Sequence, residues 1–510
     1  MAHKIQEGWL NAHKDTISII HVNDIETNLS SAIFNAVAQR KPTLMKDYAS
    51  IRNNWQIMNW DLLQLARSKN ISLNGTRWKP DDPIFVLGEE RDKGGMIGSR
   101  RDHPVMLANL TLFKFLKATF APNNWLYWTG ELSIFEEQVE MSATIPNDVN
   151  KENEDIQDGW KAFRILENGI SNFESDNKSN KSRDDSSLWI PMLWLSHPGV
   201  VAHTHYDTQH NMFIQIHGTK RFLLFPPATE LFSYPNIHRS YRQSQLHFEE
   251  PHSNFTSRLG SFTHIFQPTH HPEGSIQLET IPAPTTSFSP SYPIVDGSQS
   301  AIEVLLQPGD VLYIPPYWQH RVESLTLSLS LSILSPSHLE AAFAEIYWES
   351  VPFGDFKTSK EARATAVKWF LTLLIDKLIQ KHVITSSNNT IQFAQELYFT
   401  RFQLLPSYMN DQLYSCPITY TFNSSFNDTS TTNTTETVST QEVKEIEMQQ
   451  LMKKNQKNFN KAVSQLVELL LEVDAEEAIK RTFLRDYMEQ IVRWAVGPKH
   501  TAGFIYKCFI

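Results

Sequence analysis

The chain has 510 residues, of which 41% are hydrophobic and 20% are charged, a composition typical of globular proteins rather than disordered or fibrous ones. With 46 basic and 56 acidic residues, its net charge is −10, which disfavours unspecific binding to nucleic acid. The two cysteines, Cys416 and Cys508, are too few for a disulfide scaffold or a zinc ribbon, so we expect a reducing compartment.

The N-terminal sequence lacks the apolar run of a signal peptide. The longest apolar stretches are short and contain charged residues, so none has the length of a membrane-spanning helix. We therefore expect no membrane segment and a cytoplasmic or nuclear location.

Residues 1–148 are expected to form a mixed α/β part that supports the core. Apolar residues have helical spacing in 59–66 and 106–116, whereas the aromatic stretch 123–132 favours a strand. The polar stretch 149–187 favours a long surface loop.

Residues 188–335 have a β pattern, in which short apolar runs are separated by glycine and proline. The strict alternation of leucine with polar residues in 325–333 predicts a strand with one buried face. Within this block, 251–300 contains seven prolines, so we expect an inserted loop with little regular structure.

Residues 336–510 have a helical pattern. Capping boxes, Ser337 with Glu340 and Thr358 with Glu361, predict two helix starts.

One helix face is predicted near the C-terminus, where apolar residues recur with helical spacing. Its members are Phe459, Val463, Leu466, Val467 and Leu470. A final helix is expected to end near Gly497, and the polar stretch 423–440 favours a disordered linker.

Two separated motifs favour a metal site. His205 and Asp207 are two residues apart, so on a strand they point to the same face. His320 follows the Pro-Gly-Asp turn and apolar run that begin at Pro308. Either motif alone is weak, but two imidazoles and one carboxylate together can occupy one face of an octahedral ion and leave three positions open.

At these residues the sequence resembles the JmjC-type cupins, the Fe(II)- and 2-oxoglutarate-dependent oxygenases. Within them it is most similar to the hypoxia-inducible-factor asparaginyl hydroxylase subgroup. The resemblance rests on 205–227, 242–245 and 308–325 and covers about 188–335. It implies a mainly β core with flanking helices, in which a double-stranded β-helix (jelly-roll or cupin) barrel is followed by a C-terminal helical region.

The resemblance also implies site residues. The iron ligands would be His205, Asp207 and His320, and 2-oxoglutarate is expected to be the cosubstrate. Residues expected to contact 2-oxoglutarate are Lys220, Tyr127, Asn211 and Ser332, and those expected to contact the substrate are Arg242 and Gln243. On its position alone, Lys220 favours a solvated strand edge. Ala202 stands where the subgroup has a threonine that contacts 2-oxoglutarate.

The activity implied is hydroxylation of a side chain of a protein substrate, with release of succinate and CO2. A lysine demethylase, a tRNA-base hydroxylase and a catalytically silent cupin scaffold remain as alternatives. The resemblance further suggests a homodimer through the C-terminal helices, to which Trp348, Trp369 and Phe370 are candidate contributors. Alternatively, these residues cap the barrel in a monomer.

Overall fold

The computed structural model describes only part of the chain. The described residues are 18–21, 36–46, 58, 60–78, 106–119, 126–139, 191–198, 200–227, 246–249, 260–270, 276–280, 302–335, 337–402, 416, 440–497 and 500–509.

The chain divides into two compact units. The first comprises residues 1–85, 101–232 and 242–340, and the second 86–100, 233–241 and 341–510.

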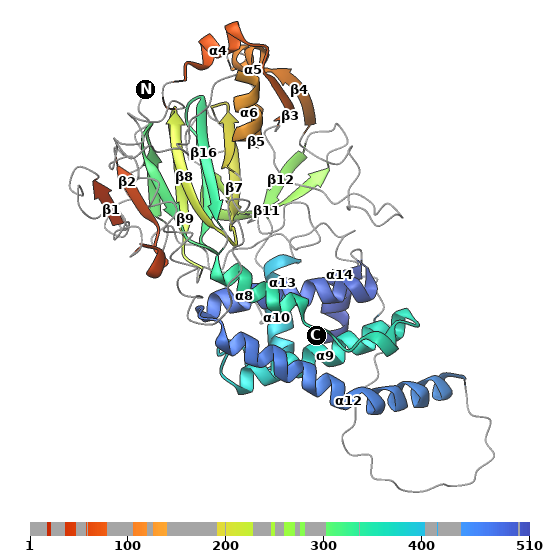
Figure 1. Cartoon of the computed structure of the whole chain (residues 1–510). Helices are drawn as coiled ribbons and strands as arrows, with labels where there is room; N and C mark the ends of the chain where they lie inside the picture. The colour runs from red at the N-terminus through yellow and green to blue at the C-terminus, as the bar shows by residue number, and fades with distance from the viewer. Residues whose placement is uncertain are drawn as a thin grey trace, which may run out of the picture. The chain divides into compact units, whose positions relative to one another are not determined.

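The first unit is built around a large sheet (Figure 1). Among the described strands, the sheet order is β1-β2-β14-β8-β16-β6-β5-β3-β4. In that order the strands span Ser18–His21, Thr43–Lys46, Val311–Ile314, His210–His217, Ser328–Ser335, Pro191–Ser196, Leu126–Glu131, Ser72–Trp78 and Met106–Thr111. All described pairings within this sheet are antiparallel except that of β1 with β2.

A second sheet has the order β13-β9-β15-β7 and is also antiparallel. Its strands span Ile302–Leu306, Lys220–Phe225, Gln319–Ser324 and Val201–His205. Phe213 of β8 meets Phe222 of β9 edge to face, with ring centroids 4.9 Å apart. A buried apolar cluster from β2, β8 and β14 of the large sheet and β9 and β13 of the second fills the space between them. The two sheets therefore enclose a common core, and the expected mainly β cupin core is confirmed.

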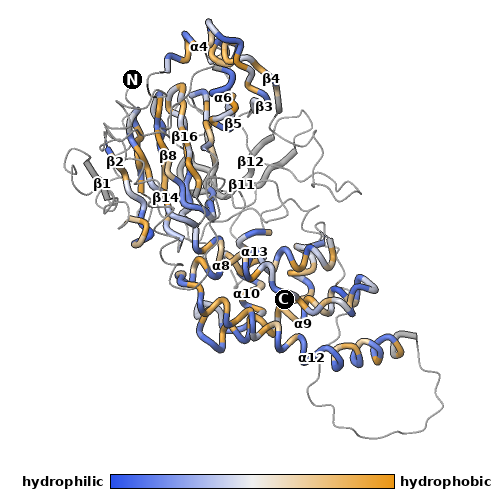
Figure 2. The backbone as a smooth tube through the Cα atoms, viewed as in Figure 1, coloured by the Kyte–Doolittle hydropathy of each residue, from blue (hydrophilic) through white to orange (hydrophobic). Residues whose placement is uncertain are grey.

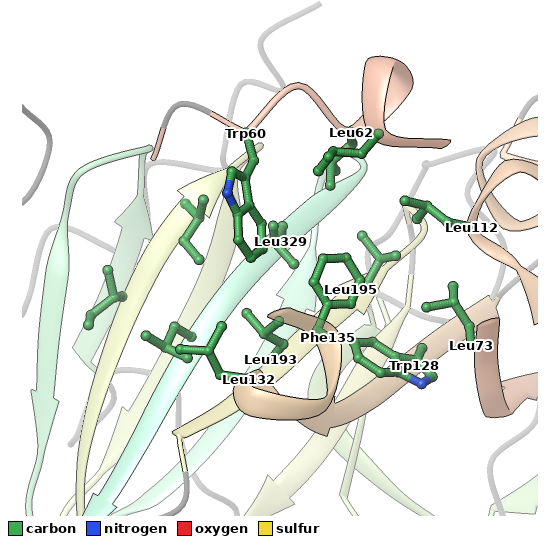
Figure 3. Packing of buried hydrophobic residues seen from close by; sticks show 14 of the residues in the cluster. Trp60, Leu62, Leu73, Leu112, Trp128, Leu132, Phe135, Leu193, Leu195 and Leu329 are labelled. Carbon is green, nitrogen blue, oxygen red and sulfur yellow. The ribbon is translucent and has the colours of Figure 1, made fainter. Parts of the chain in front are cut away.

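The opposite face of the large sheet is covered by three short helices, α4 (Leu62–Ser68), α5 (Leu112–Ala118) and α6 (Leu132–Val139). Figure 3 shows Leu62, Leu112, Leu132 and Phe135 of these helices over side chains of β5, β6 and β16. Burial of such large apolar side chains is worth about 1.5–3 kcal/mol each. The flanking helices thus seal the outside of the barrel.

The strand β16 departs from its predicted environment, because every residue from Ser328 to Ile333 is buried. Its leucines, such as Leu331, join the cluster under the helices. Its serines face the barrel, where Ser330 Oγ donates to Gln215 Oε1 at 2.9 Å. The expectation of one buried face is therefore wrong: the strand lies between two layers, and hydrogen bonds allow its polar face to be buried.

Two segments of the first unit differ from expectation in secondary structure. Residues 106–116 are not one helix, since β4 precedes α5, and the helix starts where the Thr111 side chain accepts the backbone N–H of Lys114. The segment 251–300 contains more regular structure than expected, because β11 (Gly260–His270) pairs with β12 (Ile276–Thr280) and β10 (Leu246–Glu249). Of the described strands, only β12 pairs with β11 at Pro268, and a position with one neighbour tolerates a proline.

The second unit is helical in its described part, as expected for the C-terminal region. Its elements are α8 (His338–Trp348, which begins in the first unit), η5 (Gly354–Phe356), α9 (Lys360–Gln380), α10 (Thr390–Arg401), α12 (Thr440–Glu472), α13 (Glu477–Val496), α14 (Thr501–Phe504) and η7 (Ile505–Phe509). Hydrophilic and hydrophobic residues alternate along α12 in Figure 2. All five residues of the predicted apolar face of this helix are buried, which confirms that face.

The helix boundaries follow the predicted caps with one correction. The backbone N–H of Glu340 donates to Ser337 Oγ at 2.9 Å. At α9 the cap is Ser359, not Thr358, because the Ser359 hydroxyl accepts the backbone N–H of Ala362 at 3.0 Å. The helix α13 stops at Gly497 as predicted, and the φ of 86° at this position suits glycine. It is not the final helix, however, because α14 and η7 follow it.

Some expectations fall outside the described residues. The polar loop 149–187 does so completely, and the linker 423–440 does so except for Thr440, which opens α12. The described helices include none that is both long and apolar enough to cross a bilayer.

Two side chains proposed for a dimer contact are used within the unit. Phe370 is buried, and Trp369 stacks on Phe459 with ring centroids 4.1 Å apart. Trp348 is 86% exposed, so of the three it alone offers a largely open surface. The homodimer stays a prediction.

The cysteines also differ from expectation. Cys416 and Cys508 form a disulfide, with Cα atoms 5.6 Å apart and a sequence separation of 92 residues. Residues so far apart in the chain are brought together only by the helical fold, so two cysteines gave no signal of pairing in the sequence.

Candidate metal centre

The two metal motifs meet at the end of the β7–β15 pair. His205 is the last residue of β7 and lies directly opposite His320 of β15 in the strand register. Their ring centroids are 4.2 Å apart. Asp207 lies just beyond the end of β7, and its Oδ2 is 3.6 Å from His320 Nε2. One donor atom from each of the three residues lies within 4.8 Å of the other two.

A bend between β14 and β15 orients this cluster. Pro315 and Pro316 end β14, and Tyr317 takes the left-handed conformation with φ of 65°. The Tyr317 N–H donates to the Asp207 carbonyl at 2.8 Å, and its ring stacks on Tyr206. A left-handed residue other than glycine costs about 1–2 kcal/mol, and such strain is characteristic of functional sites. The bend thus links the segment carrying Asp207 to the segment carrying His320.

The surroundings of His320 favour its neutral form. Its Nδ1 lies 3.1 Å from the Trp318 carbonyl, a contact that favours the proton on Nδ1 and leaves the Nε2 lone pair for a ligand. Burial and the neighbouring His205 lower the pKa of His320, although Asp207 and the Trp318 carbonyl oppose the shift. A neutral imidazole beside a carboxylate is the protonation state that divalent metals require.

Lys220 lies inside the barrel and not at a solvated edge. It opens β9, where Phe222 and Leu224 point into the core between the sheets, and strand alternation puts Lys220 on the same side. Its Nζ is 5.1 Å from the centroid of the Phe213 ring, and the residue is 4% exposed. Burial lowers the pKa of Lys220 to about 7.

Among the described residues, no side chain forms a hydrogen bond or an ion pair with the Lys220 ammonium. A buried cation without a counter-ion is costly, and a carboxylate ligand would relieve that cost.

The barrel wall beside Lys220 carries serines that sequence reasoning missed. Ser324 lies opposite Lys220 in the strand register, and its Oγ is 2.6 Å from Ser196 Oγ on the other sheet. Ser196 in turn lies opposite Tyr127 in β5. These residues form a polar row that crosses from one sheet to the other. Serine in a strand carries little signal by itself, so only the pairing of the two sheets could find them.

The other predicted residues are distributed as follows. Ser332 Oγ donates to Asn211 Oδ1 at 2.8 Å, so these two expected 2-oxoglutarate contacts are brought together. Ala202 lies opposite Val322 of β15. Arg242 and Gln243 fall outside the described residues.

The comparisons with known proteins agree with this geometry. Residues 33–351 match the cupin-like domain family, which extends the region recognised in the sequence in both directions. The chain is 34% identical over 139 residues to Jumonji C domain-containing protein 5 of Drosophila melanogaster, covering 27% of this chain and 26% of that protein. It is 28% identical over 149 residues to lysine-specific demethylase JMJ30 of Arabidopsis thaliana, covering 29% and 26%.

A third relative has a lower sequence identity, but its alignment covers a larger share of both chains. The chain is 22% identical over 213 residues to the human tRNA wybutosine-synthesizing protein 5, covering 42% of this chain and 51% of that protein. The chain spans only about a quarter of the length of the first two relatives. The asparaginyl hydroxylase subgroup stays a prediction. The family match over more than half of the chain, together with the converging His205, Asp207 and His320, shows that the protein belongs to the JmjC-type cupins.

Proposed function

We propose that the protein is an Fe(II)- and 2-oxoglutarate-dependent dioxygenase that hydroxylates a side chain of a protein substrate and releases succinate and CO2. The observation that carries the proposal is the convergence of His205, Asp207 and His320 within 4.8 Å. Two imidazoles and one carboxylate are the donor set of facial iron sites, whereas zinc usually favours closed four-coordinate sites, often with cysteine ligands.

In this proposal His205, Asp207 and His320 hold the metal. Bound Fe(II) would supply the redox chemistry that activates dioxygen, which no amino-acid side chain provides. The chain supplies position: the Trp318 carbonyl orients His320, and the bend at Tyr317 supports Asp207.

Lys220 is proposed to bind the distal carboxylate of 2-oxoglutarate. Its buried amine lies on the barrel side of β9. His320 lies opposite Leu224, which follows Lys220 by four residues in β9, so at the usual strand rise Lys220 and the level of His320 are about 13 Å apart. Tyr127, Asn211 and Ser332 are proposed as further contacts. Ala202 cannot donate the hydrogen bond expected of threonine, and the Ser196–Ser324 row offers hydroxyl groups nearby.

The substrate class rests on the proposed substrate contacts and on the net charge of the chain. Arg242 and Gln243 are proposed to contact the substrate, and the net charge of −10 disfavours an RNA substrate. Relatives named as a lysine-specific demethylase and a tRNA wybutosine-synthesizing protein keep demethylation and tRNA oxidation as alternatives. A cytoplasmic or nuclear location is part of this proposal.

The test is succinate formation by the purified full chain with Fe(II), ascorbate and 2-oxoglutarate. Asp207→Ala should lower the rate by more than about 100-fold, since changes to outer-shell partners alone cost about 10–100-fold. The Asp207 side chain is 33% exposed, so its loss should leave the fold intact. His217→Ala, at an exposed position of β8, is the matched control and should retain full activity. If the wild type neither takes up metal nor forms succinate, the result supports the catalytically silent scaffold.

The substrate alternatives are separated by product. Addition of one oxygen to a protein-derived peptide without formaldehyde supports side-chain hydroxylation. Release of formaldehyde from a methyl-lysine peptide supports demethylation, and oxygen incorporation into tRNA supports the third alternative. Either of the last two results would overturn the proposed substrate class while preserving the oxygenase.

A further inference from the structure

The helical unit contains a pocket of about 460 Å³ that the barrel chemistry does not use. One wall is formed by the end of α8 and the segment through η5, including Tyr347, Glu349 and Phe353. The facing wall is one side of α13. Its residues Tyr487, Gln490, Ile491 and Trp494 are spaced by three or four positions and therefore share a helix face. The volume lies within the range of small-ligand sites.

Four aromatic rings contribute to the walls. Phe353 stacks on Trp494 with centroids 5.2 Å apart, and Tyr347 contacts Tyr487 with centroids 5.7 Å apart. Trp494 is 42% exposed, so part of its indole surface remains open. Rings gathered around an open space present negative π faces, which attract organic cations.

Two polar groups in the pocket lack partners of their own. The Tyr487 hydroxyl is buried and has no hydrogen-bond partner in the part of the chain that the structure describes, and the residue is 4% exposed. The Glu349 carboxylate has no hydrogen bond or ion pair among the described residues. Tyr487 and Glu349 line the same pocket, and burial together with the charge of Glu349 raises the pKa of Tyr487. A donor between them would satisfy both groups.

We propose that this pocket binds an organic ammonium group, with Glu349 as the counter-ion and the rings of Tyr347, Tyr487 and Trp494 as the walls. The sole basic residue among the described lining, Lys357, is exposed and lies on an aqueous side where its repulsion is screened. The ammonium group belongs either to a free amine or to a lysine side chain of a peptide. The inference is independent of the oxygenase proposal.

The first experiment measures calorimetric binding of choline to the full chain, beside the uncharged carbon isostere of choline. The isostere has the same shape without the charge, so choline should bind at least about tenfold more tightly if the ring faces and Glu349 recognise charge. Equal binding of the two would overturn the proposal in favour of a merely apolar pocket. No binding of any cationic probe at millimolar concentration would also overturn it.

The variants have matched controls on the same elements. Glu349→Gln and Trp494→Ala should each weaken choline binding by about tenfold, whereas Glu345→Gln and Trp348→Ala should leave it unchanged. Glu345 is exposed one helical turn before Glu349, and Trp348 is exposed outside the pocket lining. If the controls weaken binding as much as the pocket variants, the cation binds elsewhere and the proposal fails.

The Tyr487 hydroxyl gives a second readout. Tyr487→Phe should weaken binding of a primary amine such as propylamine, because its N–H groups donate to the hydroxyl oxygen, but should spare tetramethylammonium, which has neither N–H nor O–H groups. Loss of both ligands to the same extent would contradict the assigned role of the hydroxyl. Tighter binding of a short lysine peptide than of propylamine would identify the source as a peptide, and the reverse would identify a free amine.

Discussion

At the scale of single residues, Lys220 shows how a strand can bury a charged side chain. Its neighbours in the sequence gave no sign of burial. Because side chains alternate along β9, however, the Lys220 side chain points toward the apolar core. Its ammonium lacks a hydrogen bond or ion pair within the described part of the chain. The cost of this arrangement should appear as a dependence of stability on pH.

In the folded protein the pKa of Lys220 is about 7, below its usual 10.5. Between these two values the unfolded chain binds more protons than the folded chain, so the free energy of unfolding should rise with pH across this window. The rise attributable to Lys220 is on the order of 4 kcal/mol. It can be measured by urea unfolding of the full chain without 2-oxoglutarate at pH 7 and pH 10.

Lys220→Met should remove this part of the slope and stabilise the protein at pH 7, because no buried charge remains. Lys114→Met, at an exposed position of α5, should leave the slope unchanged. The same Lys220→Met variant should weaken the binding of 2-oxoglutarate by about 10–100-fold, since one charge-assisted hydrogen bond is worth about 1.5–3 kcal/mol. An unchanged pH slope would contradict the burial of the amine, and unchanged affinity would contradict its role in binding.

At the scale of elements, β16 shows why a correct strand pattern can predict the wrong environment. Alternation of leucine and serine fits a strand with one wet face, but the serines of β16 lie in the barrel and pair with Gln215 and Asn211. Both faces should therefore be sensitive to substitution.

Leu331→Ala should lower the free energy of unfolding by about 2–5 kcal/mol through loss of buried contacts. Ser330→Ala should cost about 1–3 kcal/mol, because the buried Gln215 Oε1 loses its donor. Denaturant unfolding measures both values, with Ser133→Ala on the exposed face of α6 as the control. A Ser330→Ala variant as stable as the control would show that water, rather than the barrel, satisfies this face.

At the scale of the whole molecule, the disulfide between Cys416 and Cys508 ties the helical unit together. It closes a loop of about 92 residues, for which loss of chain entropy in the unfolded state corresponds to about 4.6 kcal/mol. Cys416→Ser should therefore lower stability by this order under oxidising conditions and should have little effect in the presence of a reductant.

Peptide mapping of the protein without reduction checks the link itself, and thermal unfolding with and without reductant checks its contribution. Equal stability of the wild type in both conditions would contradict a stabilising disulfide. The expectation of a reducing compartment, made from the number of cysteines, is not supported by this pairing.

Much of the architecture was accessible from local patterns. The buried face of α12 was predicted because its apolar residues recur with the helical period of 3.6 residues, which can be recognised in the sequence itself. The stretch 106–116 was mistaken for one helix because its apolar spacing also fits a strand followed by a helix, and only pairing with β3 decides between them.

The sequence alone determined the metal motifs and the cupin class, because His205, Asp207 and His320 lie in recognisable local contexts and strand and helix periods are local properties. Only the tertiary structure decided what surrounds them: the burial of Lys220, the Ser196–Ser324 row between the sheets, the cysteine pair and the pocket beside Tyr487. Each of these depends on residues far apart in the chain, and burial and pairing of that kind arise only when the elements pack against one another.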